Sequence, residues 1–410
     1  MQNFVLDSVI SRCSNSEMGI AGGSLGFLLD LIRRRSPITR AELASITGLA
    51  RSTIAQRVDQ LISDGFITEV GEAMSTGGRP ATMLGFNADS GVVLVADLGA
   101  THSRLAVCDL VARPLAETSR EIQISQGPDV VLGWVLEAFA DLLVEVGQSK
   151  EDVRGIGIGV PGPVDFAAGR AVHPPIMPGW DDYPIRDRIV DVYEVPVLVD
   201  NDVNIMALGE YWAMHPKVDD FIFVKVGTGI GSGLIIGGNL QRGARGAAGD
   251  IGHVQAGSAD VMCRCGNPDC LEASAGGAAI ARSLSRQRDV AGSREIVALV
   301  QAGDHSAIQA VREAGRLIGS VLAATVNLLN PAVIAIGGDL AEAGQQLLAG
   351  IREIVYQRST AMSTSDLRII NGSLGDRAGV IGAAALVIEH LFSPESVDVA
   401  LVGTTSGGAA

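Results

Sequence analysis

The residues with the clearest capacity for chemistry are three cysteines and a histidine that lie close together in the chain. They are His253, Cys263, Cys265 and Cys270. Thiolate and imidazole groups are the ligands that tetrahedral Zn²⁺ prefers, and a set of four leaves no open position for catalysis. The alternative, free thiols buried as small apolar groups, is disfavoured because charged and polar residues are interleaved with the cysteines. The segment therefore predicts a structural zinc site.

Two carboxylates, Asp250 and Glu272, flank this segment. Because the metal ion would already have four ligands, we predict that both carboxylates bind a small molecule and that the zinc site holds them in place. A second polar cluster, at residues 200–204, follows a strand predicted at 195–199 and precedes a helix predicted at 205–214. Open α/β sheets bind ligands where a strand ends and a helix begins. A helix N-cap accounts for one of these polar side chains but not for the whole cluster.

Strand–turn–strand units with small residues at their tips occur twice, at residues 92–111 and 221–236. The repetition indicates a duplicated α/β fold whose halves face each other. Tips without side chains expose backbone N–H groups that can bind phosphate, although either tip alone would be an ordinary glycine hairpin. A third strand, at residues 332–336, also runs into glycines. The predicted phosphate- or nucleotide-binding residues are Asp97, Gly99, Thr101, Gly227, Thr228, Gly229, Gly337 and Gly338.

Length and composition restrict the class of protein. With 410 residues, the chain is too long for one core and is expected to form two or three domains. No apolar run of about 18 residues is present, and no charged segment leads into an apolar one at the N-terminus. The five cysteines, an odd number, argue against a disulfide framework. We therefore expect a cytoplasmic protein without a membrane partner.

Residues 24–88 have the spacing of a winged helix-turn-helix domain, preceded by an arm at residues 1–23. Apolar spacing predicts a first helix after Ser24. A capping box at residues 39–42, Thr-Arg-Ala-Glu, opens a second helix, and a turn then leads into a third helix at residues 51–64. This succession of three helices is typical of helix-turn-helix DNA-binding domains.

Two short strands, at residues 66–70 and 83–86, are joined by a glycine-rich tip and are typical of a wing. The third helix exposes short polar and basic side chains, as a DNA-reading helix does. The alternative is a small helical interaction module with solvated arginines. The predicted DNA contacts are Arg51, Ser52, Thr53, Gln56 and Arg57 on the helix and, entering the minor groove from the wing, Arg79.

The distribution of charge also restricts where DNA could bind. The chain has a net charge of −15, yet residues 1–90 carry eight arginines against nine acidic residues. Within residues 33–80 seven arginines face five acidic residues. An acidic body repels phosphate backbones, so only the N-terminal segment is expected to approach DNA.

Several motifs are distinctive when taken together. They are Gly48-Leu-Ala-Arg51-Ser-Thr-Ile54, Gly77-Gly-Arg-Pro80, Asp97-Leu-Gly-Ala-Thr101, Gly159-Val-Pro-Gly-Pro163, Asn201-Asp-Val-Asn204, Gly249-Asp-Ile-Gly-His253 and Cys263-Arg-Cys-Gly-Asn-Pro-Asp-Cys270-Leu-Glu272. With these motifs the chain resembles the ROK (repressor, open reading frame, kinase) family over residues 24–390. It is more similar to the family's winged-helix regulators than to its stand-alone sugar kinases.

The resemblance implies that residues 91–392 form a duplicated α/β body of the actin-like, hexokinase-type (ribonuclease H-like) fold with a sugar in its cleft. By the same resemblance, Asn201, Asp202, Asp250, His253 and Glu272 would contact the sugar, and His253 would also be a zinc ligand. Asp250 stands where the kinases have glutamate, and it is one methylene shorter. The remaining residues, 393–410, are rich in Gly, Ser, Thr and Ala and are predicted to be a disordered tail.

Two functions remain open under this resemblance. The first is a sugar-responsive transcriptional regulator of carbohydrate-metabolism genes, a repressor that binds a palindromic double-stranded operator as a homodimer or homotetramer. The second is an ATP-dependent sugar kinase, similar to glucokinases or N-acetylhexosamine kinases, that carries a regulatory DNA-binding domain. It would use ATP and Mg²⁺, with Asp202 taking the proton from the attacking sugar hydroxyl. We favour the regulator, because Ala100 replaces the second glycine usual in the kinases' first phosphate loop and adds a Cβ where backbone must approach phosphate.

Overall fold

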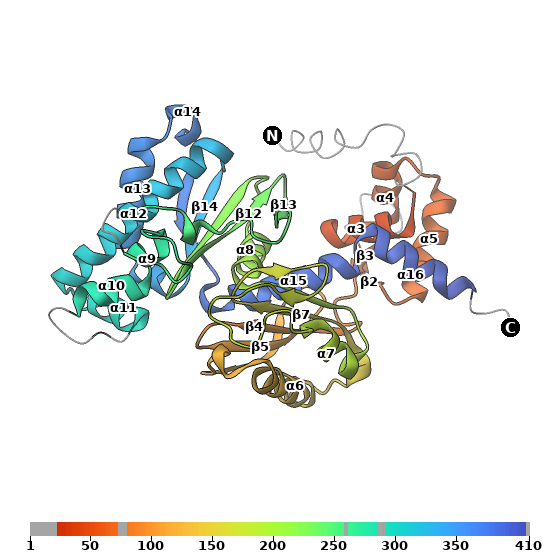
Figure 1. Cartoon of the computed structure of the whole chain (residues 1–410). Helices are drawn as coiled ribbons and strands as arrows, with labels where there is room; N and C mark the ends of the chain where they lie inside the picture. The colour runs from red at the N-terminus through yellow and green to blue at the C-terminus, as the bar shows by residue number, and fades with distance from the viewer. Residues whose placement is uncertain (1–22, 73–79, 258–260, 286–289, 291, 407–410) are drawn as a thin grey trace. The chain divides into compact units, whose positions relative to one another are not determined.

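Two compact units make up the computed structural model of this chain (Figure 1), which describes residues 23–72, 80–257, 261–285, 290 and 292–406. The first unit comprises residues 1–92, 109–111 and 387–410. The second comprises residues 93–108 and 112–386.

A winged helix forms the centre of the first unit. Its helices are α3 (Leu25–Arg35), α4 (Arg40–Thr47) and α5 (Arg51–Ser63). Its sheet has the order β1-β3-β2 and consists of β1 (Ile38–Thr39), β2 (Ile67–Glu72) and β3 (Thr82–Phe86). Buried Leu28, Ile32, Leu43, Ile54 and Leu61 line its core. The winged helix-turn-helix fold predicted from the sequence is thus confirmed.

Local capping signals decide where these helices begin. Ser24 is the N-cap of α3, and its side chain accepts a hydrogen bond from the backbone N–H of Phe27. The capping box between Thr39 and Glu42 is present at the start of α4, where the Thr39 N–H donates to the Glu42 carboxylate at 2.8 Å. Each of these bonds satisfies a helix N–H that would otherwise lack a partner.

The C-terminal end of the chain belongs to the same unit. Helix α15 (Ala378–Leu391) leads to α16 (Pro394–Ser406), which packs against α3. The backbone N–H of Gly26 donates to Asp398 Oδ1 at 2.8 Å, and a Cβ on Gly26 would lie 2.2 Å from the carbonyl oxygen of Pro394. The predicted disordered tail is therefore wrong over Pro394–Ser406, whereas residues 407–410 lie outside the described residues.

Both the packing of this helix and its start have identifiable causes. The Phe392 ring packs edge-on against Phe66 and Phe86, with centroid distances of 6.3 and 5.0 Å. Ser393 Oγ accepts from the N–H of Ser396, and a proline follows at the first helical position. Serine before proline is a usual start of a helix, so this local signal outweighs the small-residue composition that suggested disorder.

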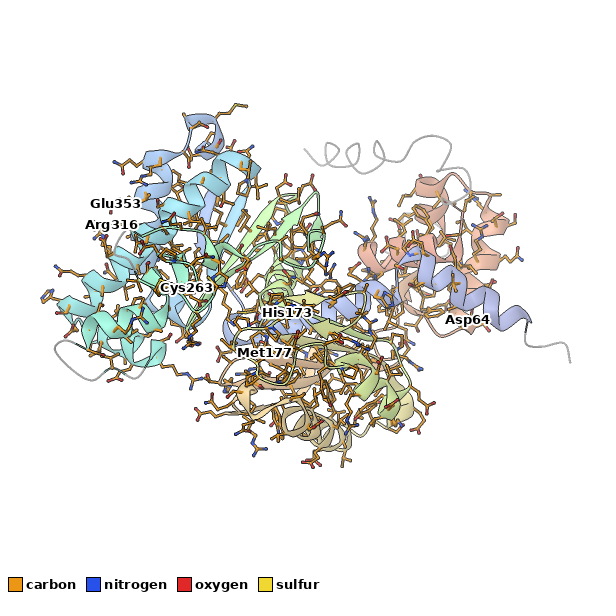
Figure 2. All side chains as sticks on the ribbon, viewed as in Figure 1. Asp64, His173, Met177, Cys263, Arg316 and Glu353 are labelled. Carbon is orange, nitrogen blue, oxygen red and sulfur yellow. The ribbon has the colours of Figure 1, made fainter. Side chains whose placement is uncertain are left out.

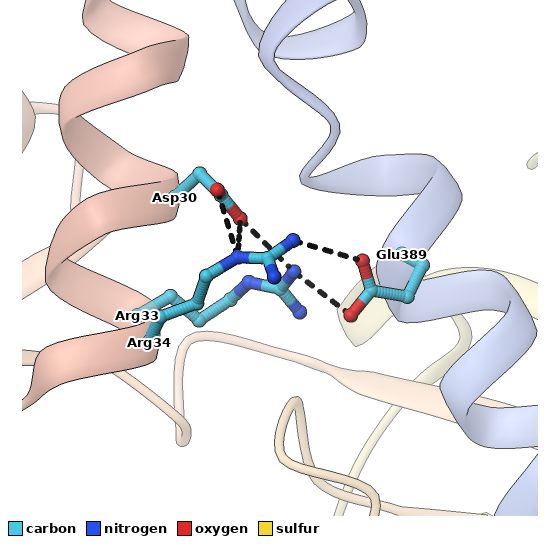
Figure 3. Close-up of polar contacts among 4 residues, drawn as sticks. All are labelled: Asp30, Arg33, Arg34 and Glu389. Carbon is cyan, nitrogen blue, oxygen red and sulfur yellow. Dashed lines mark hydrogen bonds and ion pairs between the residues drawn. The ribbon is translucent and has the colours of Figure 1, made fainter. Parts of the chain in front are cut away.

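An ion-pair cluster involves the arginines that end α3 (Figure 3). Arg33 Nη2 lies 3.0 Å from Glu389 Oε1 and 3.3 Å from Asp30 Oδ1. Arg34 Nε lies 2.8 Å from Asp30 Oδ2. Both guanidinium groups thus have acidic partners within the unit.

Two lobes, each built on a five-stranded sheet, form the second unit. The first sheet has the order β10-β7-β4-β5-β6, and helices α6 (Pro128–Glu145) and α7 (Ile185–Tyr193) accompany it. Its strands are β4 (Val92–Leu98), β5 (Ser103–Cys108), β6 (Pro114–Arg120), β7 (Val153–Val160) and β10 (Val197–Asn201). The strands β8 (Val164–Asp165) and β9 (Arg170–Ala171) form a separate two-stranded hairpin.

The second sheet has the order β13-β12-β11-β14-β15. Its strands are β11 (Phe221–Val226), β12 (Ile230–Ile236), β13 (Asn239–Gln241), β14 (Val333–Gly337) and β15 (Arg368–Asn371). In both lobes a three-stranded meander is extended by two further strands beside its first strand. The order is therefore the same in the two lobes, and the predicted duplicated α/β body is confirmed.

Helices cover this second sheet, and glycine allows two of them to approach closely. Helices α12 (His305–Leu329) and α13 (Gln345–Arg358) pack together. A Cβ on Gly315 would lie 2.5 Å from the carbonyl oxygen of Leu347, so only glycine fits there. Arg316 and Glu353 join the same two helices by an ion pair at 3.2 Å (Figure 2).

Shorter elements complete the second lobe. They are α8 (Asp202–Ala213), η3 (Ile251–His253), α9 (Leu271–Ala275), α10 (Gly277–Leu284), α11 (Ser293–Gln301), η4 (Asp339–Ala343), α14 (Ala361–Thr364) and η5 (Gly375–Arg377). Within the described part of the chain, no single helix is long and apolar enough to cross a membrane. The bent pair Gly375–Leu391 and Pro394–Ala400 meets that test only by joint length and composition.

The packing of α16 on α3 can be tested with a single methyl group. Gly26→Ala should lower the stability of the first unit by about 1–3 kcal/mol, because the new Cβ overlaps the Pro394 backbone and cannot move away. Gly133→Ala in α6 is the matched control, since its Cβ would meet no atom within 4 Å. The control should be neutral or stabilising by up to about 1 kcal/mol. Urea unfolding measures both, and equal stability of the two variants would contradict the packing.

Candidate functional site

The predicted metal ligands come together in the second lobe. The ligand atoms of His253, Cys263, Cys265 and Cys270 all lie within 4.8 Å of one another (Figure 2 labels Cys263). The Sγ atoms of Cys265 and Cys270 are 3.5 Å apart, and Cys263 Sγ lies 3.6 Å from His253 Nδ1. A tetrahedral zinc ion with Zn–S bonds of about 2.3 Å separates two ligating sulfurs by about 3.8 Å. The cluster therefore has the dimensions of a four-coordinate metal site.

Backbone pairing holds these ligands in register. The Cys263 N–H donates to the carbonyl of Asn267 at 2.9 Å, and Gly266 between them has a φ of 92°. Burial, together with the neighbouring Cys265 and Cys263, raises the pKa of the Cys270 thiol to about 12. A cation at the centre of the cluster would reverse this effect, because a metal ion favours the thiolate.

Each polar side chain of the cluster at residues 200–204 has a partner of its own. Asn201 is the N-cap of α8: its Oδ1 accepts from the N–H groups of Val203 and Asn204, and its Nδ2 donates to Gly162 O. Asp200 accepts from Arg242 Nε at 2.7 Å. The expectation that an N-cap explains only one of these side chains agrees with this arrangement.

Asp202, the residue predicted to act as a base, is tied to a lysine. Its Oδ2 accepts a hydrogen bond from Lys225 Nζ at 2.6 Å, and its side chain is only 6% exposed. Lys225 lies on β11, opposite Gly231 of β12 and Gly337 of β14. Burial lowers the pKa of Lys225, but Asp202 and Asp97 outweigh burial and raise the pKa above its usual value. We did not select Lys225 from the sequence, although a charged residue in the otherwise apolar strand 221–226 is a signal that could have found it.

The predicted phosphate tips are tight turns. The N–H of Gly99 donates to His102 O, and the N–H of Gly227 donates to Gly229 O, each at 2.9 Å. Gly338 has a φ of 82°, and its Cβ would lie 2.7 Å from Val226 O. Thr101 and Thr228 are exposed at two of these tips. Because Gly337 ends β14, which pairs with β11, and Gly338 follows it, the second and third tips lie side by side.

The beginning of β12 brings the polar cluster and the metal cluster together. A Cβ on Gly231 would lie 3.0 Å from Val203 at the start of α8. On the same strand, the Ile230 N–H donates to Glu272 Oε2 at 3.2 Å, and the Ser232 hydroxyl donates to Gly249 O at 2.7 Å. Residues 202, 249–253 and 272 therefore lie around the start of β12. His253 is half-buried there and Asp250 is exposed.

The side chains predicted to contact DNA differ in their exposure. Arg51, Ser52 and Gln56 are exposed on α5, and Thr53 is half-buried. The helix begins without a side-chain cap, so its first N–H groups remain available to a phosphate. Arg57 is half-buried, and its Nη1 would lie 3.1 Å from a Cβ on Gly23, so it faces the start of α3. Arg79 lies outside the described residues.

Comparison with known proteins identifies both parts of the chain. The model of the ROK family matches residues 93–390, and that of a winged helix-turn-helix DNA-binding domain matches residues 28–68. The chain belongs to the ROK family. A crystal structure of a ROK family transcriptional regulator, a homologue of the E. coli Mlc protein, is similar with a TM-score of 0.80 and 27% identity. The match covers 92% of this chain and 98% of that one.

Two curated ROK relatives differ in what they include. The xylose repressor of Caldicellulosiruptor bescii is 31% identical over 372 residues, covering 87% of this chain and 93% of the repressor. A glucokinase from Halalkalibacterium halodurans is 30% identical over 318 residues, covering 73% of this chain and 96% of the kinase. This ROK protein is thus similar to the repressor over more of its length.

The metal cluster predicts that substitution of one of its cysteines removes the bound metal. Cys270→Ser should remove the bound metal and lower the thermal stability of the second unit, because structural zinc contributes about 10–16 kcal/mol in such sites. Cys108→Ala in β5, outside the cluster, should retain the metal. Elemental analysis of freshly purified protein measures the metal, and about one zinc per chain is expected in the wild type. An unchanged metal content in Cys270→Ser would contradict the assignment.

The environment of Asp97 predicts a pH dependence of stability. The pKa of Asp97 is raised to about 7, chiefly by burial, while Lys225 lowers it and Asp202 raises it. The contribution of Asp97 to stability is therefore fully present below its ordinary pKa of 3.8 and is lost as the pH rises through about 7. Asp97→Asn should gain stability relative to the wild type as the pH is raised from 4 to 8. Melting temperatures measure this, and exposed Asp141→Asn, the control, should show no such trend.

Proposed function

We propose that this ROK protein is a cytoplasmic, sugar-responsive transcriptional regulator that represses carbohydrate-metabolism genes. The carrying observation is that a winged helix with an open, uncapped recognition helix occurs in one chain with a ROK body. The long match to a xylose repressor supports a sugar as the effector. Arg51, Ser52, Thr53 and Gln56 would contact operator DNA, and Arg79 would contact it from the wing.

The effector site would lie at the start of β12. Asp202, Asp250, His253 and Glu272 would contact the sugar, and a structural zinc ion would hold His253 and Glu272 in place. Asn201 already uses its Oδ1 as a helix cap, which leaves only part of its amide for a ligand. Because the sugar would touch both the start of α8 and the metal-bound segment, its binding would favour one arrangement of the lobes. The coupling free energy between sugar binding and DNA binding would then be about 1–3 kcal/mol.

An operator of palindromic sequence would require two copies of the recognition helix, so we propose a homodimer or homotetramer as the active form. The ATP-dependent sugar kinase remains the second candidate. It is supported by the glucokinase relative and by the position of Asp202 at the end of β10. Against it stands the ion pair that engages the Asp202 carboxylate.

Operator affinity measured with and without sugar tests the proposal. We expect a subset of pentoses, hexoses or N-acetylhexosamines to change the affinity of the full-length protein for DNA from its own promoter region. A coupled assay with Mg²⁺, ATP and the same sugars should give no turnover. Sugar-dependent turnover of ATP would favour the kinase instead.

The recognition helix predicts a mutational effect on the same assay. Arg51→Ala should weaken operator binding by about 1–3 kcal/mol if the arginine reads a base, and its effect should be uniform across sequences if it contacts phosphate. Arg188→Ala, on the exposed face of α7 in the second unit, is the control and should bind as the wild type does. Fluorescence anisotropy at fixed salt measures both, and equal binding by the two variants would exclude Arg51 from the interface.

A further inference from the structure

Lys225 is the one charged residue of β11, whose other side chains are apolar and buried. Its ammonium lies 2.6 Å from the Asp202 carboxylate, and the two side chains are 29% and 6% exposed. A half-buried ammonium loses much of its hydration, and a nearby anion must compensate for that loss. The position of Lys225 is therefore coupled to the acidic groups around it.

Three different elements carry those acidic groups. Asp202 begins α8, Asp97 lies near the end of β4, and Asp339 begins η4. Asp202 contacts the Lys225 ammonium directly, and Asp339 follows two residues after Gly337, which pairs with Lys225 across β11 and β14. All three carboxylates raise the pKa of Lys225. Asp97 is confined on its other side, since a Cβ on Gly379 would lie 2.0 Å from its Oδ2.

Phosphoryl transfer would make two demands on these carboxylates. A divalent cation must bridge oxygen ligands and phosphate oxygens, and a free carboxylate must accept the proton of the attacking hydroxyl. Lys225 opposes both demands. Its ammonium already supplies positive charge to the acidic groups, and its hydrogen bond to Asp202 means that this carboxylate is not free. The residues at this position thus do not fit a magnesium-dependent reaction.

We propose that Lys225 is a resident cation of the cleft, which takes the place of a divalent metal ion and keeps Asp202 in a permanent ion pair. Its single positive charge pairs with the Asp202 carboxylate and partly offsets the negative charge of Asp97 and Asp339. The cleft accordingly holds its ligand without Mg²⁺ and without acting on it. This inference rests on the proposed function, in which the cleft binds an effector.

Removal of the ammonium should convert the position into a metal site. With Mn²⁺ as the probe and zinc-loaded full-length protein, Lys225→Met should bind one additional Mn²⁺ per chain, at least about tenfold tighter than the wild type does. Lys217→Met is the matched control: it removes a lysine of the same lobe whose ammonium lies over the Tyr211 and Trp212 rings. Electron paramagnetic resonance measures the free Mn²⁺.

Double variants distinguish a metal site at Lys225 from Mn²⁺ binding on other acidic surfaces. The added site should disappear in Lys225→Met combined with Asp97→Asn. Equal Mn²⁺ binding by the wild type and Lys225→Met, or an added site that survives Asp97→Asn, would overturn the proposal. If Lys225→Met does not fold, Lys225→Met combined with Asp202→Asn should fold again because it restores the charge balance, and failure of both variants to fold would contradict charge neutralisation.

A failure of the proposed function would give a different result. Operator and sugar binding by the wild type are measured in parallel and do not depend on Mn²⁺. Absence of both, together with a gained metal site in Lys225→Met, would reject the regulator but leave Lys225 as the resident cation.

Discussion

The close approach of β12 to the segments on both sides of it is the constraint on which the candidate site depends. A Cβ on Gly233 would lie 2.4 Å from the Ala207 Cβ in α8, and one on Gly252 would lie 2.1 Å from the carbonyl oxygen of Ile230. These contacts leave no room for a side chain. They allow the start of α8 and the metal-binding segment to meet at one strand. The packing density of a protein interior then holds them in one arrangement.

Electrostatics at the start of α8 follows from this packing. Asp200 and Asp202 lie at a helix N-terminus, where the helix dipole favours negative charge, and each also has a cationic partner. Arg242, which pairs with Asp200, also stacks over the Phe166 ring at 3.9 Å. The acidic groups are therefore compensated by the chain itself.

The DNA-binding unit is assembled from both ends of the chain. The face of α3 around Gly26 is covered by α16, and Phe392 fills the space between Phe66 and Phe86. Contacts between residues so far apart in sequence are expensive in chain entropy until the rest of the unit is formed. Helix α5 packs against α3, α4 and β2 of the same unit, and Arg51, Ser52 and Gln56 remain exposed on it.

Much of the fold was open to prediction from the sequence, because its signals are local. Apolar periodicity, the Ser24 cap and the box of Thr39 and Glu42 decided the winged helix, and repeated apolar strands with glycine tips decided the duplicated body. The spacing of the three cysteines also predicted a cluster with His253, since ligand type and turn residues are local properties. The helix at Pro394–Ser406 was missed, because its composition was weighed above the Ser393-Pro394 start.

Partnerships between distant residues, by contrast, were decided only by the tertiary structure. Nothing local in the sequence pairs Lys225 with Asp202 or Arg242 with Asp200, because strand order and the packing of α8 on β12 create those contacts. The same holds for Arg57, whose helical position suggested an exposed side chain but which faces the start of α3. The sequence by itself determined which chemical groups the chain carries and the elements that bear them. The tertiary structure decided which charges neutralise one another, because that depends on distance through space.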